Sequence, residues 1–251
     1  EKINMSGVNS INWARIICQI VYYFYAAFKI GKQDISFAVP TGNFGDIYAG
    51  YVAKKMGLPI NKLVVATNSN DILKRVINSG TYKLLKVKHT ISPSMDIQVA
   101  SNFERLIFDV CCQDSNKILK LMNNLKEHGE FELEKKDLDK IQENFYSESL
   151  SEEETRKVIK KIYKNQRMLI DPHTAVAIGV AEKLSLKENA IILATAHPSK
   201  FSDVVLKETN IKPELPENLQ PILIKKEICK HLPKDLEKVK NYILKNAKKI
   251  N

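Results

Sequence analysis

The sequence lacks the cysteine patterns that signal disulfide frameworks or metal centres. Its four cysteines are Cys18, Cys111, Cys112 and Cys229, and none of them belongs to a Cys-x-x-Cys pair. No cluster of His, Cys and carboxylate residues has the spacing of a zinc site. Because the cysteines lie within apolar segments, we expect them to be reduced and structural, which favours a cytoplasmic location.

Glycine, proline and long apolar runs are also scarce. Nine Gly and nine Pro among 251 residues exclude collagen-like and low-complexity sequence. The longest apolar stretches, residues 16–28 and 168–184, contain polar residues and indicate buried helices rather than membrane spans. A chain of this length can bury a substantial core, as one large domain or two smaller ones.

Basic residues outnumber acidic ones, 39 against 29, which gives a net charge of +10. Most of the basic residues are lysines interleaved with Glu, as in residues 125–139 and 151–164, a pattern typical of solvated helix faces. No zinc-finger spacing or aromatic-rich basic motif accompanies them. We therefore expect no nucleic-acid or membrane partner, and the basic charge suits an enzyme with phosphorylated, anionic substrates.

Strand-like and helix-like segments alternate along much of the chain. Short apolar runs that end in polar loops predict strands at 35–39, 62–66 and 190–194. Helical apolar spacing, caps and glycine stops predict helices at 9–28, 46–56, 71–78, 102–110 and 174–184. A succession of strand, loop and helix predicts an α/β fold with a parallel sheet and right-handed crossovers.

The segment 114–166 differs from its surroundings because it is highly charged and almost entirely helical in pattern, with no expected strand. Ser151 and Glu154 have the spacing of a capping box. We interpret 114–166 as a helical insertion between two parts of one α/β domain, residues 1–113 and 167–251. The second part ends in a tail with an expected strand at 222–224 and a helix at 234–248.

The loop from Thr41 to Asp46 lies between an expected strand and an expected helix. Gly42 and Gly45 allow a tight turn whose N–H groups point outward, and the amino end of the helix adds partial positive charge. This pattern suits a bound phosphate, although it is neither a Walker A loop nor a dinucleotide fingerprint. The alternative is a plain turn and helix cap, with Asp46 as the N-cap.

Six segments resemble threonine synthases, in the order in which that family carries them. They are residues 9–16, 40–46, 66–71, 92–97, 101–105 and 194–201. Threonine synthases are pyridoxal-phosphate enzymes of the tryptophan-synthase-β-like fold, also called fold type II. The resemblance therefore implies a three-layer α/β domain with a parallel sheet, here with the helical insertion.

The resemblance also implies a reaction and a cofactor. Threonine synthases convert O-phospho-L-homoserine and water into L-threonine and phosphate, with pyridoxal 5'-phosphate as the electron sink. In this mapping the backbone amides of Gly42, Asn43, Phe44 and Gly45 hold the cofactor phosphate. Thr195 matches the hydroxyl partner of the pyridine nitrogen, and a neutral hydroxyl leaves that nitrogen largely unprotonated.

Five further positions match the family and are candidate ligands of the substrate carboxylate, amine or phosphate: Ser10, Asn12, Asp96, Asn102 and Arg105. On chemistry, Arg105 is the best phosphate candidate, because a planar guanidinium can hold two oxygens at once. A surface ion pair is the alternative role for Arg105. Loop and helix capping are the alternatives for Asp96 and Asn102. We expect His173 and His197 to make local hydrogen bonds.

The cofactor lysine of the family follows a Phe and precedes an Asp, and no Phe-Lys-Asp occurs in this sequence. Neither Lys29 nor Lys200 fits that role. The chain also begins at Glu1 without Met. We therefore expect a carboxyl-terminal fragment of a threonine synthase that lacks the amino-terminal small domain and the lysine segment, and that is inactive alone.

Two other functions stay open. The first is a related pyridoxal-phosphate enzyme, such as a threonine dehydratase or a cysteine synthase. The second is a non-catalytic protein that keeps the phosphate site and binds the ligand without turning it over. The sequence allows either a monomer or a homodimer.

Overall fold

The computed structural model describes residues 7, 9–32, 34–186 and 190–247. The chain divides into two compact units, residues 10–213 and a second unit of residues 1–9 with 214–251. Each is described here by itself. Within the described residues, no helix combines the length and the apolar character needed to cross a membrane.

The larger unit is built on a four-stranded sheet with the order β5-β2-β1-β6 and parallel pairing throughout. Its strands are β1 (Ile35–Pro40), β2 (Ile60–Thr67), β5 (Phe145–Ser149) and β6 (Ala190–Ile192). The register places Pro40 opposite Ala66, so β1 and β2 end at the same edge of the sheet. The expected parallel α/β fold is confirmed.

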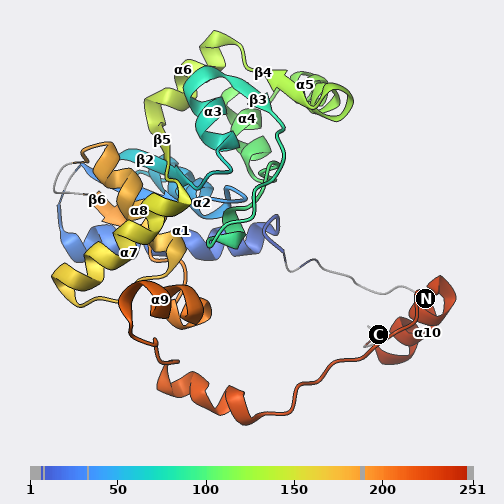
Figure 1. Cartoon of the computed structure of the whole chain (residues 1–251). Helices are drawn as coiled ribbons and strands as arrows, with labels where there is room; N and C mark the ends of the chain where they lie inside the picture. The colour runs from blue at the N-terminus through green and yellow to red at the C-terminus, as the bar shows by residue number, and fades with distance from the viewer. Residues whose placement is uncertain (1–6, 8, 33, 187–189, 248–251) are drawn as a thin grey trace. The chain divides into compact units, whose positions relative to one another are not determined.

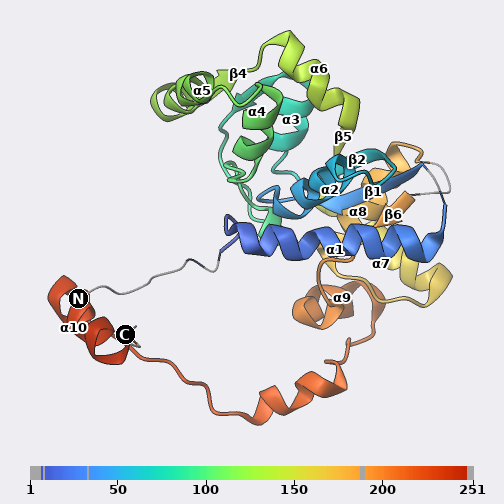
Figure 2. The same ribbon diagram turned by 180° about the vertical axis from the view of Figure 1, so that it is seen from behind.

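Helices cover both faces of the sheet, which makes three layers (Figures 1 and 2). α1 (Trp13–Ile30) and α2 (Gly45–Lys55) lie on one face, and α7 (Glu152–Gln166) and α8 (Pro172–Lys183) lie on the other. Alternate strand residues divide between two cores: Phe37 packs with the first pair of helices, and Ala38 with the second. This alternation follows from the two-residue period of a strand.

A lobe between β2 and β5 carries the remaining elements before α7. It contains α3 (Ile72–Ser79), β3 (Thr81–Lys83), the 3₁₀ turn η1 (Pro93–Met95), α4 (Phe103–Val110), α5 (Ser115–His128), β4 (Glu130–Glu132) and α6 (Lys135–Asn144). β3 and β4 pair antiparallel in a separate two-stranded sheet. After β6 follow the 3₁₀ turn η2 (Pro198–Phe201) and α9 (Ser202–Thr209).

The prediction that 114–166 contains no strands is wrong. α5, α6 and α7 are helical as expected, and the Ser151–Glu154 capping box is present. The same segment also holds β4 and β5, and β5 is a strand of the main sheet. Its sequence, FYSES, is polar, and the strand is stabilised by its pairing with β2 and by the Ser147 hydroxyl, which donates to the Val65 carbonyl at 2.9 Å.

The second unit contains the 3₁₀ segment η3 (Glu217–Ile224) and α10 (Leu236–Asn246). The strand expected at 222–224 is wrong, because these apolar residues are the last three of η3. The helix expected at 234–248 is confirmed as α10. Residue 248 lies outside the described residues.

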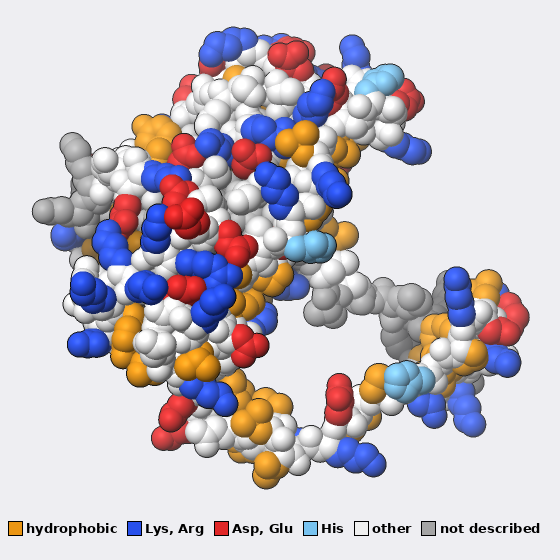
Figure 3. Space-filling model, viewed as in Figure 1, with side chains coloured by type: hydrophobic (Ala, Val, Ile, Leu, Met, Phe, Trp, Pro, Cys, Tyr) orange, Lys and Arg blue, Asp and Glu red, His pale blue; other side chains and the backbone are white. Residues whose placement is uncertain are grey.

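The charged side chains form no one-sign stripe on the face shown in Figure 3, where Lys and Arg are interspersed with Asp and Glu. Several of these residues pair along one helix, such as Lys157 with Glu153 at 2.6 Å and Arg156 with Glu152 at 2.8 Å on α7. This arrangement agrees with solvated helix faces.

Helix α2 packs closely against α1 and β2 at Gly50. A Cβ at this position would lie 2.4 Å from Cε1 of Tyr23 and 2.9 Å from Cδ2 of Leu63. Although Ala is favoured over Gly by about 1 kcal/mol in an open helix, we expect Gly50→Ala to lower the free energy of unfolding by about 1–3 kcal/mol through overpacking. Urea denaturation measures this, with the exposed Asn123→Ala on α5 as the control. Stabilisation by Gly50→Ala would contradict the close packing.

Candidate active site

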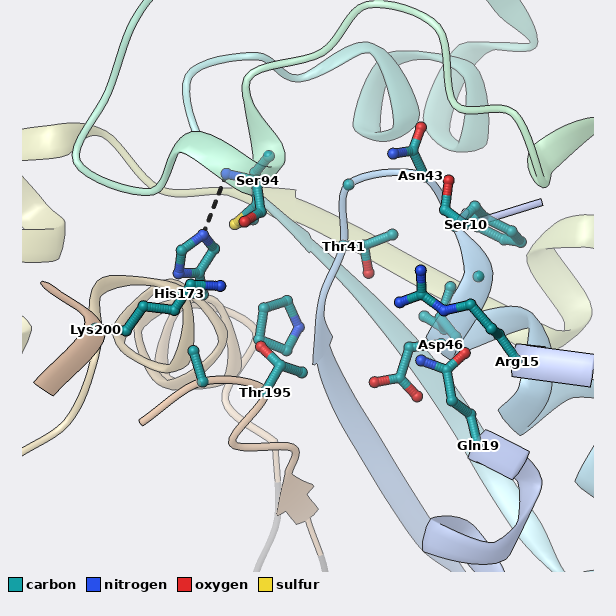
Figure 4. A pocket seen from close by; sticks show the side chains of 17 residues that line it. Ser10, Arg15, Gln19, Thr41, Asn43, Asp46, Ser94, His173, Thr195 and Lys200 are labelled. Atoms are coloured by element: carbon teal, nitrogen blue, oxygen red, sulfur yellow. Dashed lines mark hydrogen bonds between the residues drawn. The ribbon is translucent and has the colours of Figure 1, made fainter. Parts of the chain in front are cut away.

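A cavity of about 240 Å³ opens at the carboxyl ends of β1 and β6 (Figure 4). From one side, Thr195 and Lys200 approach it, and from the other, Arg15 and Gln19 of α1. The lining residues are Ser10, Arg15, Gln19, Pro40, Thr41, Gly42, Asn43, Phe44, Gly45, Asp46, Ile47, Ser94, Met95, His173, Thr195, Ala196 and Lys200.

The position of the cavity follows from the topology. In the sheet, β1 lies between β2 and β6. The chain leaves β1 and reaches β2 through α2, which covers one face of the sheet. It reaches β6 through α8, which covers the opposite face. Connections therefore diverge between β1 and β6. In open parallel sheets, this divergence leaves a crevice at the carboxyl ends of the strands, where ligands bind.

The loop 41–45 forms the floor of the cavity. Thr41 fixes its beginning, because its N–H donates to the Ala66 carbonyl at 2.8 Å and its hydroxyl donates to the Val39 carbonyl at 2.7 Å. Phe44 has a left-handed backbone, with φ at 64°, directly before α2. Its side chain is buried against Phe103 and Phe145, with ring centroids 5.1 and 5.7 Å away, and this packing holds the unusual backbone conformation.

Four successive N–H groups of this loop are available to an anion. Within the described part of the chain, the N–H groups of Gly42, Asn43, Phe44 and Gly45 donate to no protein acceptor. They precede the first turn of α2, whose amino end carries partial positive charge. Gly42 is required here, because a Cβ would lie 2.4 Å from the backbone oxygen of Ser94.

Asn102 lies beneath the loop and does not line the cavity. Its side chain is fully buried, and its Nδ2 donates to the carbonyls of Ser10 at 2.8 Å and Asn43 at 3.0 Å. Arg105 Nε donates to Asn102 Oδ1 at 3.1 Å, and Arg105 Nη2 donates to the Ile11 carbonyl at 2.9 Å. Both side chains therefore belong to the hydrogen-bond network that connects the loop 41–45 with the residues before α1.

Asn12 and Asp96 are likewise engaged away from the cavity lining. Asn12 caps α1 by accepting from the Ala14 N–H at 2.9 Å. Asp96 Oδ1 accepts from Asn68 Nδ2, Asn70 Nδ2 and the Thr90 hydroxyl at 2.8, 3.0 and 2.7 Å. Of the five residues matched to the substrate, the structure brings only Ser10 into the cavity.

Both histidines make the expected local hydrogen bonds, and His173 also makes a long-range one. His173 Nδ1 lies 3.0 Å from Asp171 Oδ1, and His173 Nε2 accepts from the Ser94 N–H at 3.3 Å. The Asp171 contact places the ring proton on Nδ1, and His173 thereby links α8 to the wall of the cavity. His197 caps η2 by accepting from the Ser199 N–H at 3.3 Å.

The prediction that Asp46 is a helix N-cap is wrong. The N-cap of α2 is Phe44, and Asp46 lies in the first helical turn and lines the cavity. The Tyr23 hydroxyl lies 2.9 Å from the Asp46 carbonyl and 3.3 Å from its Oδ1. Burial raises the pKa of Asp46 to about 6, partly offset by this hydrogen bond. Asp46 can therefore exchange a proton near neutral pH.

Two further residues that line the cavity, Arg15 and Gln19, were not predicted from the sequence. They lie four residues apart on α1 and so share one face of the helix. Arg15 forms no ion pair with any residue that the structure describes. Arg15 is the single charged residue in the otherwise apolar helix expected at 9–28. Its charge indicates a polar environment on the side of the helix that carries Arg15.

The fold and the site define an α/β enzyme domain of fold type II, and known proteins narrow this further. A family model described as "Threonine synthase, C-terminal" matches residues 174–243. The threonine synthase of Pseudomonas aeruginosa is 42% identical over 242 residues, which cover 94% of this chain and 52% of that protein. For the Saccharomyces cerevisiae threonine synthase, the identity is 44% over 274 residues, covering 97% of this chain and 53% of that protein.

The structural comparison agrees. A crystal structure of pyridoxal-phosphate-bound threonine synthase from Brucella melitensis matches with a TM-score of 0.92 and 44% identity, over 97% of this chain and 53% of that one. This chain is therefore similar to threonine synthases over nearly its whole length. It spans about half the length of the curated relatives that it matches.

The raised pKa of Asp46 predicts a pH dependence of stability. Because the pKa is about 6 in the folded chain against 3.8 for a solvated aspartate side chain, the folded state binds the proton more tightly. Ionisation of Asp46 therefore costs stability as pH rises from 4 to 7, by at most about 3 kcal/mol. We expect Asp46→Asn to gain stability relative to the wild type over this range.

Urea denaturation at several pH values measures this difference. The exposed Asn123→Ala on α5 is the control, because it changes no ionisable group, and its difference from the wild type should stay nearly constant over the same range. A difference for Asp46→Asn that does not change with pH would show that the carboxylate is solvated.

Proposed function

We propose that this chain is the carboxyl-terminal portion of a threonine synthase, a pyridoxal-phosphate-dependent carbon–oxygen lyase. The complete enzyme converts O-phospho-L-homoserine and water into L-threonine and phosphate. The observation that carries the proposal is a set of four N–H groups, at residues 42–45, that have no acceptor among the described residues and lie at the switch point of a sheet similar to that of threonine synthases.

The residues present fit the phosphate of pyridoxal 5'-phosphate. The cradle has no side chain at Gly42, where a Cβ would collide with the Ser94 carbonyl oxygen. The N–H groups of Gly42, Asn43, Phe44 and Gly45 would hold the phosphate, and the dipole of α2 favours its charge. Thr195, three residues beyond the end of β6, would supply a neutral hydroxyl to the pyridine nitrogen.

The cofactor, when bound, withdraws electrons during the proton shifts, phosphate elimination and water addition. The side chains around it bind and orient a doubly anionic substrate. Arg15 and Lys200 bring positive charge to the cavity, and Ser10 brings a hydroxyl. Arg15 forms no ion pair with a carboxylate of the described residues, and a guanidinium can hold two phosphate oxygens, so we assign to Arg15 the phosphate-binding role expected for Arg105.

The other four residues matched to the substrate shape the site. Asn102 and Arg105 fix the loop 41–45 against the start of α1, and Asn12 caps that helix. Asp96 holds the 90–96 loop, whose Ser94 carbonyl borders Gly42. Each acts on the ligand through the backbone that it positions.

The site of this chain is incomplete without a Schiff-base lysine, because no Phe-Lys-Asp occurs in the sequence. The chain alone is therefore inactive, and the rest of the enzyme supplies the lysine and the small domain. We assign the larger unit, residues 10–213, to the large domain, and residues 114–166 contribute β5 and α7 to it rather than forming a separate insertion. All four cysteines are free, which supports a cytoplasmic location.

Phosphate release from O-phospho-L-homoserine tests the function. We expect none from the chain alone. We expect turnover from a chimera in which the amino-terminal half of the Brucella melitensis enzyme precedes Ser10. Gly42→Ala should lower kcat/KM of that chimera at least about tenfold, since about 1.4 kcal/mol of lost phosphate binding is a factor of ten. Asn123→Ala is the control.

Other outcomes identify the alternatives. Release of a 2-oxo acid from threonine by the chimera would assign a dehydratase. Binding of pyridoxal 5'-phosphate without any turnover would assign a non-catalytic binding protein. Turnover by the chain alone would contradict the need for a lysine from outside it.

A further inference from the structure

Asp46 brings a carboxyl group into a cavity whose other ionisable groups are basic. Among the described residues that line this cavity, Asp46 is the single carboxylate, and it shares the space with Arg15, His173 and Lys200. Figure 4 shows the side chain of Asp46 pointing into the cavity. Asp46 forms no ion pair with any residue that the structure describes, so no neighbouring cation compensates its charge.

The two carboxyl oxygens of Asp46 have different surroundings. Oδ1 lies 3.3 Å from the Tyr23 hydroxyl, which also donates to the Asp46 carbonyl at 2.9 Å. Oδ2 has no hydrogen-bond partner within the described part of the chain. Every fully buried side-chain oxygen of the described residues has a partner, so Oδ2 is not enclosed. Oδ2 is therefore the atom that can present a proton to a ligand, since a protonated carboxyl donates a hydrogen bond and a carboxylate only accepts.

An anion held by the loop 41–45 lies close to this carboxyl group. Asp46 directly follows Gly45, whose N–H is the last of the four that are available to an anion, and successive Cα atoms are about 3.8 Å apart. Charges interact over a Debye length, which is ~10 Å at 0.1 M salt. The ionised carboxylate therefore repels an anion on the loop, whereas the protonated carboxyl does not.

We propose that the cavity binds a dianionic phosphate group together with one proton, which Asp46 holds on Oδ2 while the anion is bound. This inference rests on the proposed function, because it concerns the same loop. The proton comes from solvent when the anion binds and returns to solvent when the anion leaves, so only an O–H bond forms and breaks. Binding is therefore weaker at high pH, where the proton is harder to take up.

The titration range of Asp46 places this exchange near neutral pH. Burial raises the pKa of Asp46 to about 6, and a bound anion raises it further. Below pH 6 the free carboxyl already carries the proton, so affinity for the anion is nearly constant. Above pH 6 affinity falls, until the pH exceeds the pKa of Asp46 in the complex. If the anion raises this pKa to about 7, the affinity falls about eightfold between pH 5 and 8.

Other ionisable groups face Asp46 from the elements around α2. Tyr23 and Arg15 belong to α1, and across the cavity His173 belongs to α8 and Lys200 to η2. β1, β2 and α4 also contact α2, but none of them places an ionisable side chain among the described lining residues. Burial raises the pKa of Tyr23 well above its usual value, and a guanidinium keeps its charge. Histidine is the residue type in this set that ordinarily titrates between pH 5 and 8, so His173 requires a control variant.

Sulfate binding tests the proposal, because sulfate keeps two negative charges from pH 5 to 8, whereas a phosphate monoester itself titrates near pH 6. The dissociation constant of sulfate is measured by calorimetry at several pH values and constant ionic strength. We expect it to rise about eightfold from pH 5 to 8 in the wild-type chain. It should change less than about twofold in Asp46→Asn, which has no proton to take up, and His173→Gln should behave as the wild type.

The ¹³C resonance of the Asp46 carboxyl carbon provides a second readout that needs no variant. Followed against pH, it should have a midpoint near 6 in the free chain. In saturating sulfate, we expect the midpoint to lie higher by about one pH unit. This readout decides the outcome if circular dichroism shows that Asp46→Asn does not fold. A midpoint that sulfate does not raise overturns the proton uptake by Asp46.

Failure of this proposal can be told apart from failure of the proposed function. Saturable sulfate binding that does not change with pH overturns the proton uptake and leaves the anion site. Absence of saturable binding at every pH contradicts the anion site, and with it both proposals. Equal pH dependence in the wild type and Asp46→Asn, or its loss in His173→Gln, assigns the proton to another group and overturns the role of Asp46.

Discussion

The buried amide of Asn102 joins three segments that are far apart in the sequence. Its Nδ2 donates to carbonyls at Ser10 and Asn43, and its Oδ1 accepts from Arg105. The start of α1, the loop 41–45 and α4 are therefore held at fixed positions around one side chain. Because the carbonyl of Asn43 is engaged below the loop, the neighbouring N–H groups are left to face the cavity. The whole candidate phosphate site depends on this arrangement.

Aromatic packing and backbone crowding complete the site. Phe44 holds a left-handed backbone because its ring is fixed between Phe103 and Phe145, and Gly42 allows the Ser94 carbonyl to approach. The cavity that results carries Arg15, Lys200 and the partly buried carboxyl of Asp46. It can therefore bind an anion and exchange a proton near neutral pH, two abilities that the proposed reaction requires.

Much of the fold was predictable because its strands are short apolar runs between polar loops, as at β1 and β2. β5 was missed because Tyr146, Ser147 and Glu148 give it no apolar pattern, and only its pairing with β2 makes it a strand. For the site, the residues of the loop 41–45 and Thr195 were predictable from spacing and resemblance. The sequence could not show that Asn102 and Arg105 are turned toward the backbone, nor that Arg15 and Asp46 are turned into the cavity, because these orientations depend on tertiary contacts.

We infer that the N–H groups of residues 42–45 form an anion site that Asn102 holds in place. Amide resonances of ¹⁵N-labelled chain, titrated with inorganic phosphate, test it most directly. We expect saturable shifts at Gly42, Asn43, Phe44 and Gly45, and loss of saturation in Asn102→Ala. Shifts confined to other amides, or unchanged titration in Asn102→Ala, would contradict it.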